Sequence, residues 1–181
     1  MRKPIPIENA YRLINPGPLV LISSLSGKRA GLTPIAWHMP ISDDPPIIAL
    51  TIWEGHFIHK AILETGDFVI NVPSSAMAGT IRKLGSVSGK RVDKFKKYGL
   101  VKEAAEKVKS PRLKSAIAVI ECKLRGDEAM RKKYNIILGN VVYAEADADV
   151  FTDRWHPEKS GPRIIQHLGG KVFSVPDRRI V

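Results

Sequence analysis

The sequence predicts a mainly β fold, an antiparallel barrel with a few short helices packed into it or over it. Short segments rich in β-branched residues recur along the chain, and hairpin-type turns join most of them. Only two or three short helical patterns separate these segments, and they do not form repeated strand–helix–strand units. Neither of the common phosphate-binding patterns, GxGxxG or GxxxxGK[ST], occurs, which argues against a nucleotide-binding α/β fold.

Length and composition predict one globular domain over residues 1–181. The hydrophobic content of 44% and charged content of 26% are ordinary for soluble proteins. No apolar run reaches the roughly 18 residues of a membrane helix, and no apolar stretch follows the basic N-terminus, so we expect a cytoplasmic protein without a membrane partner. Cys122 is the only cysteine, which excludes an intrachain disulfide and a thiolate metal cluster.

The first half of the chain predicts three strands and two turns. Residues 19–26 form the first strand, and "GKRAG" (27–31) turns the chain into a second strand, "LTPIAWHMPIS". Pro34 and Pro40 cannot donate hydrogen bonds, so they place this second strand at a sheet edge or interrupt it with bulges. "DDPP" ends it. "IIALTIW" (47–53) is the third strand, with both faces buried.

Helices then alternate with strands. The apolar residues of "EGHFIHKAILETGDF" have the spacing of a short amphipathic helix that Gly66 ends. "FVINVP" is a fourth strand, and "SSAMAGTIRKLG" is a second helix with Ser74 or Ser75 as N-cap and Gly85 as its stop. Residues 86–114 are expected to be helical in pieces. "SAIAVIECKL" and "YNIILGNVVYAEADADVF" are long strands, and "PRIIQHLGG" holds a short one.

The net charge of +11 comes from one segment, since residues 82–133 hold seventeen basic and six acidic residues while basic and acidic residues balance on either side. Three interpretations are open: a solvated face, attraction of phosphate-bearing small molecules or of an acidic protein partner, and nucleic-acid binding. Phe95 and Tyr98 are the only aromatic residues there, and no nucleic-acid-binding motif is present. Nucleic acid is therefore the least favoured partner.

Two neighbouring features indicate a binding site. Prolines interrupt the second strand, which leaves backbone N–H and C=O groups to bind a planar heterocycle. His56, His59 and Lys60 begin the first helix and are spaced to share one face, where free N–H groups and the helix dipole favour a phosphate. No cysteine or carboxylate pair completes a metal site with the two histidines, so we predict none.

The order of these segments resembles a known family. "PLVLISSLSGKRAGLTPIAWHMPISDDPPIIALTI", a short helix and "TGDFVINVP" are similar to the flavin reductase-like proteins, with flavoredoxins as near relatives, and "SGKRVDKF", "ILGNVV" and "QHLGG" follow in order. The resemblance covers roughly residues 11–173. It implies a Greek-key antiparallel split barrel that binds FMN and forms homodimers, with NAD(P)H and a flavin or a redox protein as electron donor and acceptor.

The resemblance also implies cofactor-binding roles for particular residues, and it leaves the catalytic residues unknown. Residues 32–37 would lie along the flavin ring, Thr51 to Lys60 would surround the ribityl chain and phosphate, and Asn71 would support the site. Part of "GKRVDKF" would close over the cofactor. The predicted cofactor-binding residues are Leu32, Thr33, Pro34, Ile35, Ala36, Trp37, Thr51, His56, His59, Lys60, Asn71, Lys90, Asp93, Lys94 and Phe95.

One departure from the family pattern affects the expected activity. Many relatives carry Gly-Asp-His before the strand that is "IILG" here, and this chain has Lys132, Lys133 and Tyr134 instead. Three functions therefore stay open. They are NAD(P)H-dependent reduction of flavin with onward electron transfer, an FMN electron carrier without its own NAD(P)H chemistry, and a basic nucleic-acid or partner-binding barrel without a cofactor.

Overall fold

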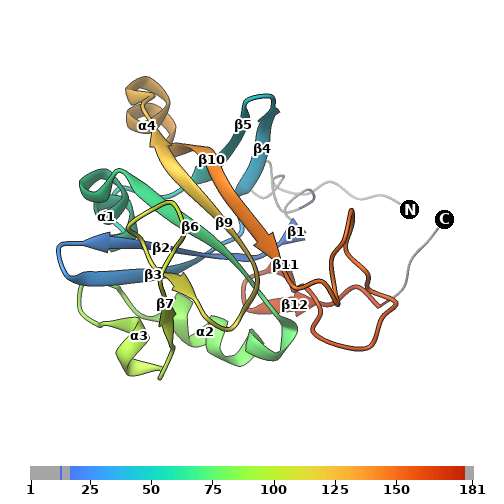
Figure 1. Cartoon of the computed structure of the whole chain (residues 1–181). Coiled ribbons are helices and arrows are strands. Elements are labelled where there is room, and N and C mark those ends of the chain that lie inside the picture. The colour runs from blue at the N-terminus through green and yellow to red at the C-terminus, as the bar shows by residue number, and fades with distance from the viewer. Residues whose placement is uncertain (1–12, 14–16, 178–181) are drawn as a thin grey trace, which may run out of the picture.

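The computed structural model describes residue 13 and residues 17–177, and its centre is one curled antiparallel sheet of seven strands (Figure 1). The strands lie in the order β3-β2-β6-β9-β10-β5-β4. Their bounds are β2 Val20–Ser26, β3 Arg29–Ile35, β4 His38–Asp43, β5 Pro46–Thr51, β6 Asp67–Pro73, β9 Ala116–Arg125 and β10 Ile136–Ala146. The predicted mainly β, antiparallel architecture is confirmed.

Smaller elements surround this sheet. A three-stranded sheet has the order β1-β11-β12, with β1 Gly17–Pro18, β11 Gln166–Gly169 and β12 Val172–Ser174, and β7 (Lys102–Glu103) pairs with β8 (Arg112–Leu113). The helices are α1 Phe57–Thr65, α2 Ala78–Ser86, α3 Lys94–Lys97 and α4 Glu128–Tyr134, and a 3₁₀ turn at Ser75–Met77 precedes α2. Among the described residues, no helix is both long and apolar enough to cross a membrane.

The segment predicted as one interrupted strand, "LTPIAWHMPIS", forms two strands at opposite edges of the sheet. The chain leaves β3 at Ala36 and Trp37 and enters β4, which pairs only with β5 among the described strands. Pro34 lies on edge strand β3, and Pro40 lies beside a bulge on edge strand β4. Both positions suit proline, because an edge strand needs ladder bonds on one side only.

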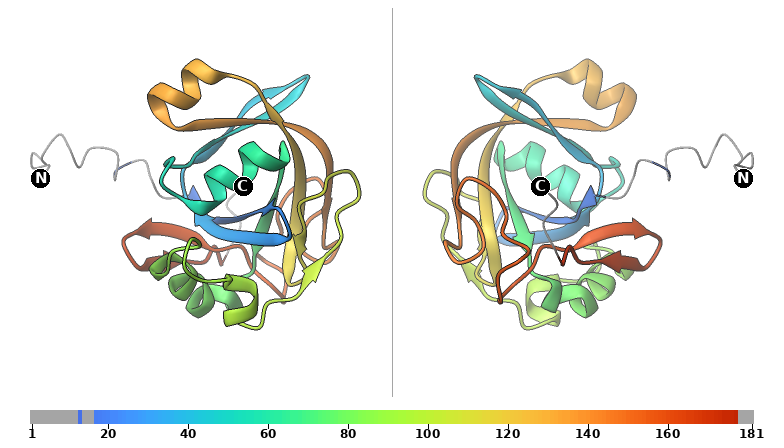
Figure 2. Two further views of the ribbon diagram at one scale, coloured as in Figure 1. Left: turned by 90° about the vertical axis from the view of Figure 1, so that its left-hand side faces the viewer. Right: turned by 90° about the vertical axis from the view of Figure 1, so that its right-hand side faces the viewer.

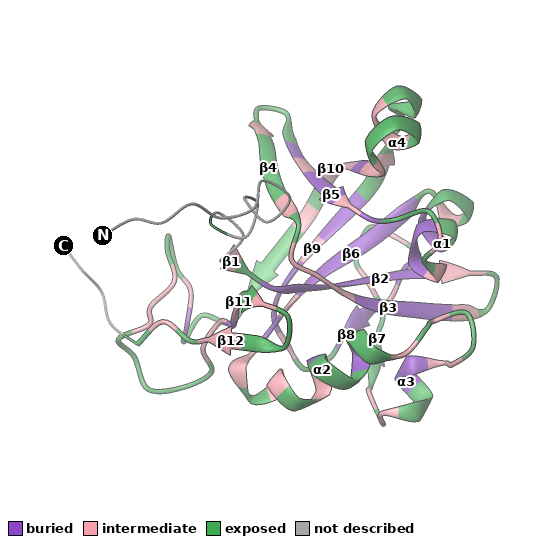
Figure 3. Cartoon of the chain, turned by 180° about the vertical axis from the view of Figure 1, so that it is seen from behind, coloured by how far each residue is buried: buried purple, intermediate pink, exposed green. Residues whose placement is uncertain are grey.

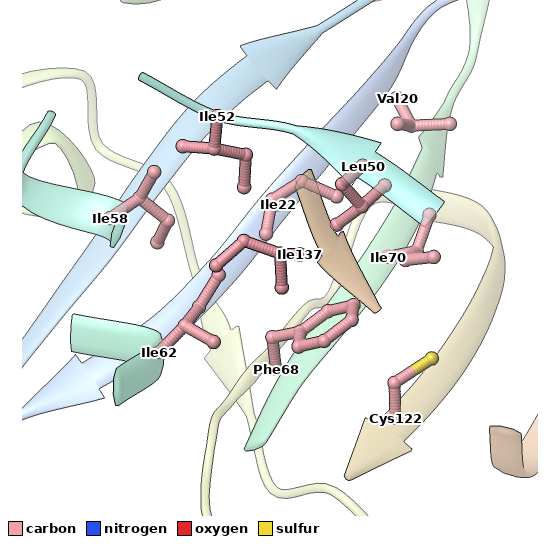
Figure 4. Packing of buried hydrophobic residues seen from close by; sticks show 10 residues of the cluster. All are labelled: Val20, Ile22, Leu50, Ile52, Ile58, Ile62, Phe68, Ile70, Cys122 and Ile137. Carbon is pink, nitrogen blue, oxygen red and sulfur yellow. The ribbon is translucent and has the colours of Figure 1, made fainter. Parts of the chain in front are cut away.

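Helix α1 plugs one end of the barrel, as the left view of Figure 2 shows. Its Ile58 and Ile62 are fully buried and meet strand residues such as Ile22, Leu50 and Phe68 in the inner core (Figure 4). A second apolar cluster, the outer cluster, lies on the other face of β2 and β3, where Leu21 and Leu32 pack against α2 and α3. Burial is therefore concentrated on the central strands, while α4 is mostly exposed (Figure 3).

The helix boundaries agree with the sequence in part. Gly66 ends α1 in the left-handed conformation, with φ of 76°, as expected. Helix α2 differs, because its N-cap is Met77, no side chain caps it, and it continues through Gly85 to Ser86. Helix α4 was not predicted from the sequence, although Asp127 caps its start and Asn135 ends it with φ of 56°.

Candidate functional site

The start of α1 is an open helix end beside an aromatic turn. His56 is the N-cap, its side chain makes no capping hydrogen bond, and the first turn of α1 contains no acidic residue. The His56 N–H donates a 2.9 Å hydrogen bond to the Trp53 carbonyl, which closes the turn between them. The two side-chain rings lie edge to face, with their centroids 5.6 Å apart. The backbone N–H groups of the first turn therefore stay available to an anion.

Two lysines from a distant part of the sequence lie near this helix end. The pKa of His56 is lowered, first by partial burial and then by the positive charges of Lys94 and Lys90. A charge changes a neighbour's pKa in this way only when the two are close in space. The structure thus brings together three of the predicted cofactor-binding residues, and the positive charge of the two lysines favours an anion there.

Packing contacts explain how residues 88–90 reach α1. Arg29, the first residue of β3, donates hydrogen bonds to the carbonyls of Gly89 and Lys90, and its guanidinium lies 4.7 Å from the centre of the Phe57 ring. A Cβ at Gly31 would come within 2.9 Å of that ring, and one at Gly89 within 3.1 Å of the Phe57 Cβ. Glycine at both positions lets the strand and the loop close on Phe57.

The other predicted residues of "GKRVDKF" have structural partners. Lys94 is buried, and its Nζ donates a 2.7 Å hydrogen bond to the Leu84 carbonyl near the end of α2. Burial lowers the pKa of Lys94 to about 8. Asp93 caps α3 by accepting the Lys96 N–H, and Phe95 is buried in the outer cluster against β3. These three residues fix the loop, while Lys90 remains exposed.

The predicted ring-binding segment follows the free edge of β3, which pairs with no described strand other than β2. Leu32 is buried in the outer cluster, whereas Pro34 and Ala36 are half-buried and Trp37 is half exposed. The Thr51 N–H donates to the Trp37 carbonyl at 3.0 Å, which joins the end of the segment to β5. Because Pro34 has no N–H, we expect its nitrogen to face the free edge. The polar backbone groups of Leu32 and Ala36 then face the same way.

Asn71 is buried on β6, which β2 separates from β3, and it stabilises the β3 edge indirectly. Its Nδ2 donates to the Leu21 carbonyl at 2.9 Å, and its Oδ1 accepts the Leu113 N–H at 2.7 Å. Leu21 pairs with both Asn71 and Pro34 across the sheet. Asn71 therefore holds β2, the strand that pairs with β3 and its binding segment.

His59 and Lys60, which were expected to share a face with His56, lie in different surroundings. His59 is buried, and its pKa is lowered by burial and then by the charge of Arg131, which faces it from α4. Lys60 is exposed, and its Nζ pairs with Glu64 one turn along at 3.3 Å. Successive residues on a helix point about 100° apart, which separates the two environments.

Helix α4 brings Tyr134 next to the site. Asn135 accepts the Ile52 N–H at its carbonyl, at 2.9 Å, and the Glu54 N–H at its Oδ1, at 3.0 Å. These bonds attach the end of α4 to the connection between β5 and α1. Tyr134, the last residue of α4, is half exposed. Sequence analysis missed Arg29, Phe57 and Asn135. For Asn135, the Asp127–Asn135 spacing of helix caps was an available signal.

Comparison with known proteins identifies the family. The family model "Flavin reductase like domain" matches residues 11–161. Protein YddH of Escherichia coli is 32% identical over 181 residues, covering 98% of this chain and 96% of that protein. A protein of Methanothermobacter thermautotrophicus is 30% identical over 165 residues, covering 86% of this chain and 77% of that protein.

Solved structures agree in fold. The FMN-binding domain of a flavin reductase-like enzyme from Shewanella baltica has a TM-score of 0.86 and 25% identity, covering 98% of this chain and 95% of that one. Flavoredoxin of Desulfovibrio vulgaris has a TM-score of 0.84 and 24% identity, covering 100% and 96%. The expected split-barrel fold is confirmed, and this chain belongs to the flavin reductase-like domain family.

Proposed function

We propose that the protein binds FMN and transfers electrons through it, from NAD(P)H to a flavin or a redox protein. The observation that carries this proposal is the uncapped start of α1, whose first turn has no acidic residue and beside which Arg29 holds the loop of Lys90. This helix end lies beside β3, since Arg29 and Phe57 join the two. An anion site next to a strand edge with free backbone groups suits a flavin phosphate and its ring.

The residues present fit such a cofactor. The phosphate would be held at the α1 start by backbone N–H groups, His56 and Lys90, and the ring would lie along residues 32–37. When bound, FMN supplies hydride and single-electron transfer. The chain contributes the binding and the orientation. Arg29 holds the loop of Lys90 in place, and Asn71 holds the strand beside the ring.

Titration of the apoprotein with FMN and riboflavin tests the proposal directly. We expect saturable quenching of FMN fluorescence at micromolar protein, and weaker binding of riboflavin because it has no phosphate. Absence of saturable binding would refute the proposal. Anaerobic mixing of the FMN-loaded protein with NADPH or NADH then tests the nicotinamide reaction by loss of the flavin absorbance.

Tyr134 favours a second candidate function, a flavoredoxin-like FMN carrier without its own NAD(P)H chemistry. The phenol stands where many relatives have a histidine, beside the connection that precedes α1. A phenol cannot carry positive charge, whereas a histidine can. A protein that binds FMN but is not reduced by either nicotinamide nucleotide would support this candidate.

We also propose a homodimer. Edge strand β4 exposes Met39 and Ile41, Trp37 just before it is half exposed, and Met39 also borders an apolar cavity of about 660 Å³. An exposed apolar edge strand favours association with a second chain. Sedimentation equilibrium should give twice the 20.0 kDa of one chain. A mass of one chain at all concentrations would contradict the dimer.

A further inference from the structure

A cleft of about 460 Å³ lies on the outer side of β3, next to the proposed flavin edge. Pro34 and Ala36 form one wall, so the cleft begins at the segment expected to carry the ring. Helix α2 forms a second wall with Ile81 and Arg82, and the β11–β12 hairpin forms the third. A volume of this size accommodates a small organic molecule.

The lining of the cleft is cationic. The cations Arg82 and Lys171 line it, and no lining residue is acidic. Neither Arg82 nor Lys171 forms an ion pair with any described residue. Their charges therefore remain available to a ligand. Arg82 belongs to α2, and Lys171 belongs to the β11–β12 hairpin, which is far away in the sequence. Such an arrangement favours an anionic group.

The floor of the cleft is apolar and well supported. Leu19 and Ile81 are buried beneath it, and Phe173 contributes an aromatic ring. The Phe173 and His167 rings lie 5.8 Å apart, and the His167 Nε2 lies 3.1 Å from the Gly170 carbonyl at the hairpin turn. The hairpin thus holds a ring against the floor, which suits a flat aromatic ligand.

The carbonyls at the end of α2 would repel an anion if they were free. Instead, the Lys83 carbonyl accepts the hydroxyls of Ser86 and Tyr98, and the Leu84 carbonyl accepts the Lys94 Nζ. A cation at a helix C-terminus offsets the negative end of the dipole. Lys94 therefore makes the α2 wall compatible with a negatively charged ligand.

We propose that this cleft binds a planar aromatic group that carries one anionic substituent, either a phosphate or a carboxylate. The ligand would be the molecule with which the flavin exchanges electrons, a step that rests on the proposed function. A nucleotide phosphate would indicate an electron donor of the NAD(P)H type, and an aromatic carboxylate would indicate a small acceptor.

Calorimetric titration of the FMN-saturated protein tests the proposal with two matched pairs of probes. The pairs are adenosine 5′-monophosphate with adenosine, and benzoate with benzamide. We expect the anion of at least one pair to bind more tightly than its neutral partner. The pair that shows the difference identifies the class of ligand. Arg82→Gln and Lys171→Gln should each weaken the anion about three- to tenfold and leave the neutral partner unchanged.

Lys83→Gln is the matched control, because it removes the neighbouring charge of α2 from a residue that does not line the cleft. It should leave anion binding unchanged. Equal binding of charged and neutral probes, an equal loss in Lys83→Gln and Arg82→Gln, or displacement of the anion by FMN would overturn the proposal. Repeating the titration on apoprotein separates the two hypotheses, since a cleft that binds anions in a protein without FMN affinity refutes only the proposed function.

Discussion

At the scale of single residues, Lys94 couples stability to pH. Its pKa in the folded protein is about 8, below the ordinary 10.5, because the ammonium is buried. Between these values the unfolded chain binds more protons, so the contribution of Lys94 to stability rises with pH across this window. Urea unfolding at pH 7.5 and 10.5 should show a larger gain for the wild type than for Lys94→Met. Equal gains would show that Lys94 does not titrate with a lowered pKa.

Lys90 and Lys60 offer a comparison of two exposed cations near α1. Lys90 acts on His56 through its charge, whereas Lys60 is paired with Glu64. Lys90→Gln should therefore weaken FMN about tenfold, the value of a charge-assisted hydrogen bond, and affect riboflavin little. Lys60→Gln serves as the control, with a smaller effect on FMN. Fluorescence titration with both flavins measures this, and an equal loss for both flavins in Lys90→Gln would move that residue away from the phosphate.

At the scale of elements, the contact between α1 and β3 depends on Gly31. A methyl group there would meet the Phe57 ring at 2.9 Å, so Gly31→Ala should cost about 1–3 kcal/mol of unfolding free energy. Phe57→Leu in the same chain should recover part of that loss. Gly79→Ala is the control in α2, where nothing lies within 4 Å, and it should stabilise by up to about 1 kcal/mol. Urea unfolding measures the unfolding free energy of each variant. Equal changes in Gly31→Ala and Gly79→Ala would contradict the close packing of β3 against Phe57.

The segment between β7 and β8 depends on Glu121. The carboxylate accepts the N–H groups of Glu106 and Lys107 at 2.8 and 2.6 Å and pairs with Arg112. Burial alone would raise the Glu121 pKa, but these partners outweigh it and hold the pKa below its usual value. Stability from this group is therefore lost as pH falls through the folded pKa.

Glu121→Gln should cost up to about 3 kcal/mol at pH 7, because buried Arg112 then keeps only the half-exposed Glu145 as an ion-pair partner. The difference from wild type should shrink towards pH 4. Unfolding in urea at both pH values measures it. Exposed Glu128 pairs with Lys132 on α4, so Glu128→Gln should change little at either pH. A Glu121→Gln difference that is constant with pH would show that the carboxylate charge is unimportant.

Sequence patterns predicted the elements well where local chemistry determines them. Gly66 ended α1 as expected, and the prolines of "LTPIAWHMPIS" indicated edge strands. Helix α4 was missed, because its few apolar residues give no clear helical spacing. The site was harder still. The burial of Lys94 and the pairing of Lys60 depend on partners that only tertiary packing brings into reach.

At the scale of the whole molecule, the basic segment 82–133 predicts a dependence of reaction rate on salt. If its field attracts an anionic donor or acceptor, the second-order rate constant should fall as ionic strength rises, while steps within the complex should not change. Lys96→Glu with Lys97→Glu should reduce the rate constant at low salt. Both side chains are exposed, unlike buried Lys94. Stopped-flow rates that are flat with salt would leave the charge as a solvated face.

The order of strands in the sheet also affects how the chain folds during synthesis. The first 51 residues supply two hairpins, β2–β3 and β4–β5, which end at opposite edges of the sheet. Their inner strands find partners only when β6 and then β10 arrive, and β10 ends at Ala146. A nascent chain therefore carries the β4–β5 hairpin without its inner partner until β10 has left the ribosome, long after β6 has joined β2. Such long-range pairing folds slowly, and the cell must protect these strand edges in the meantime.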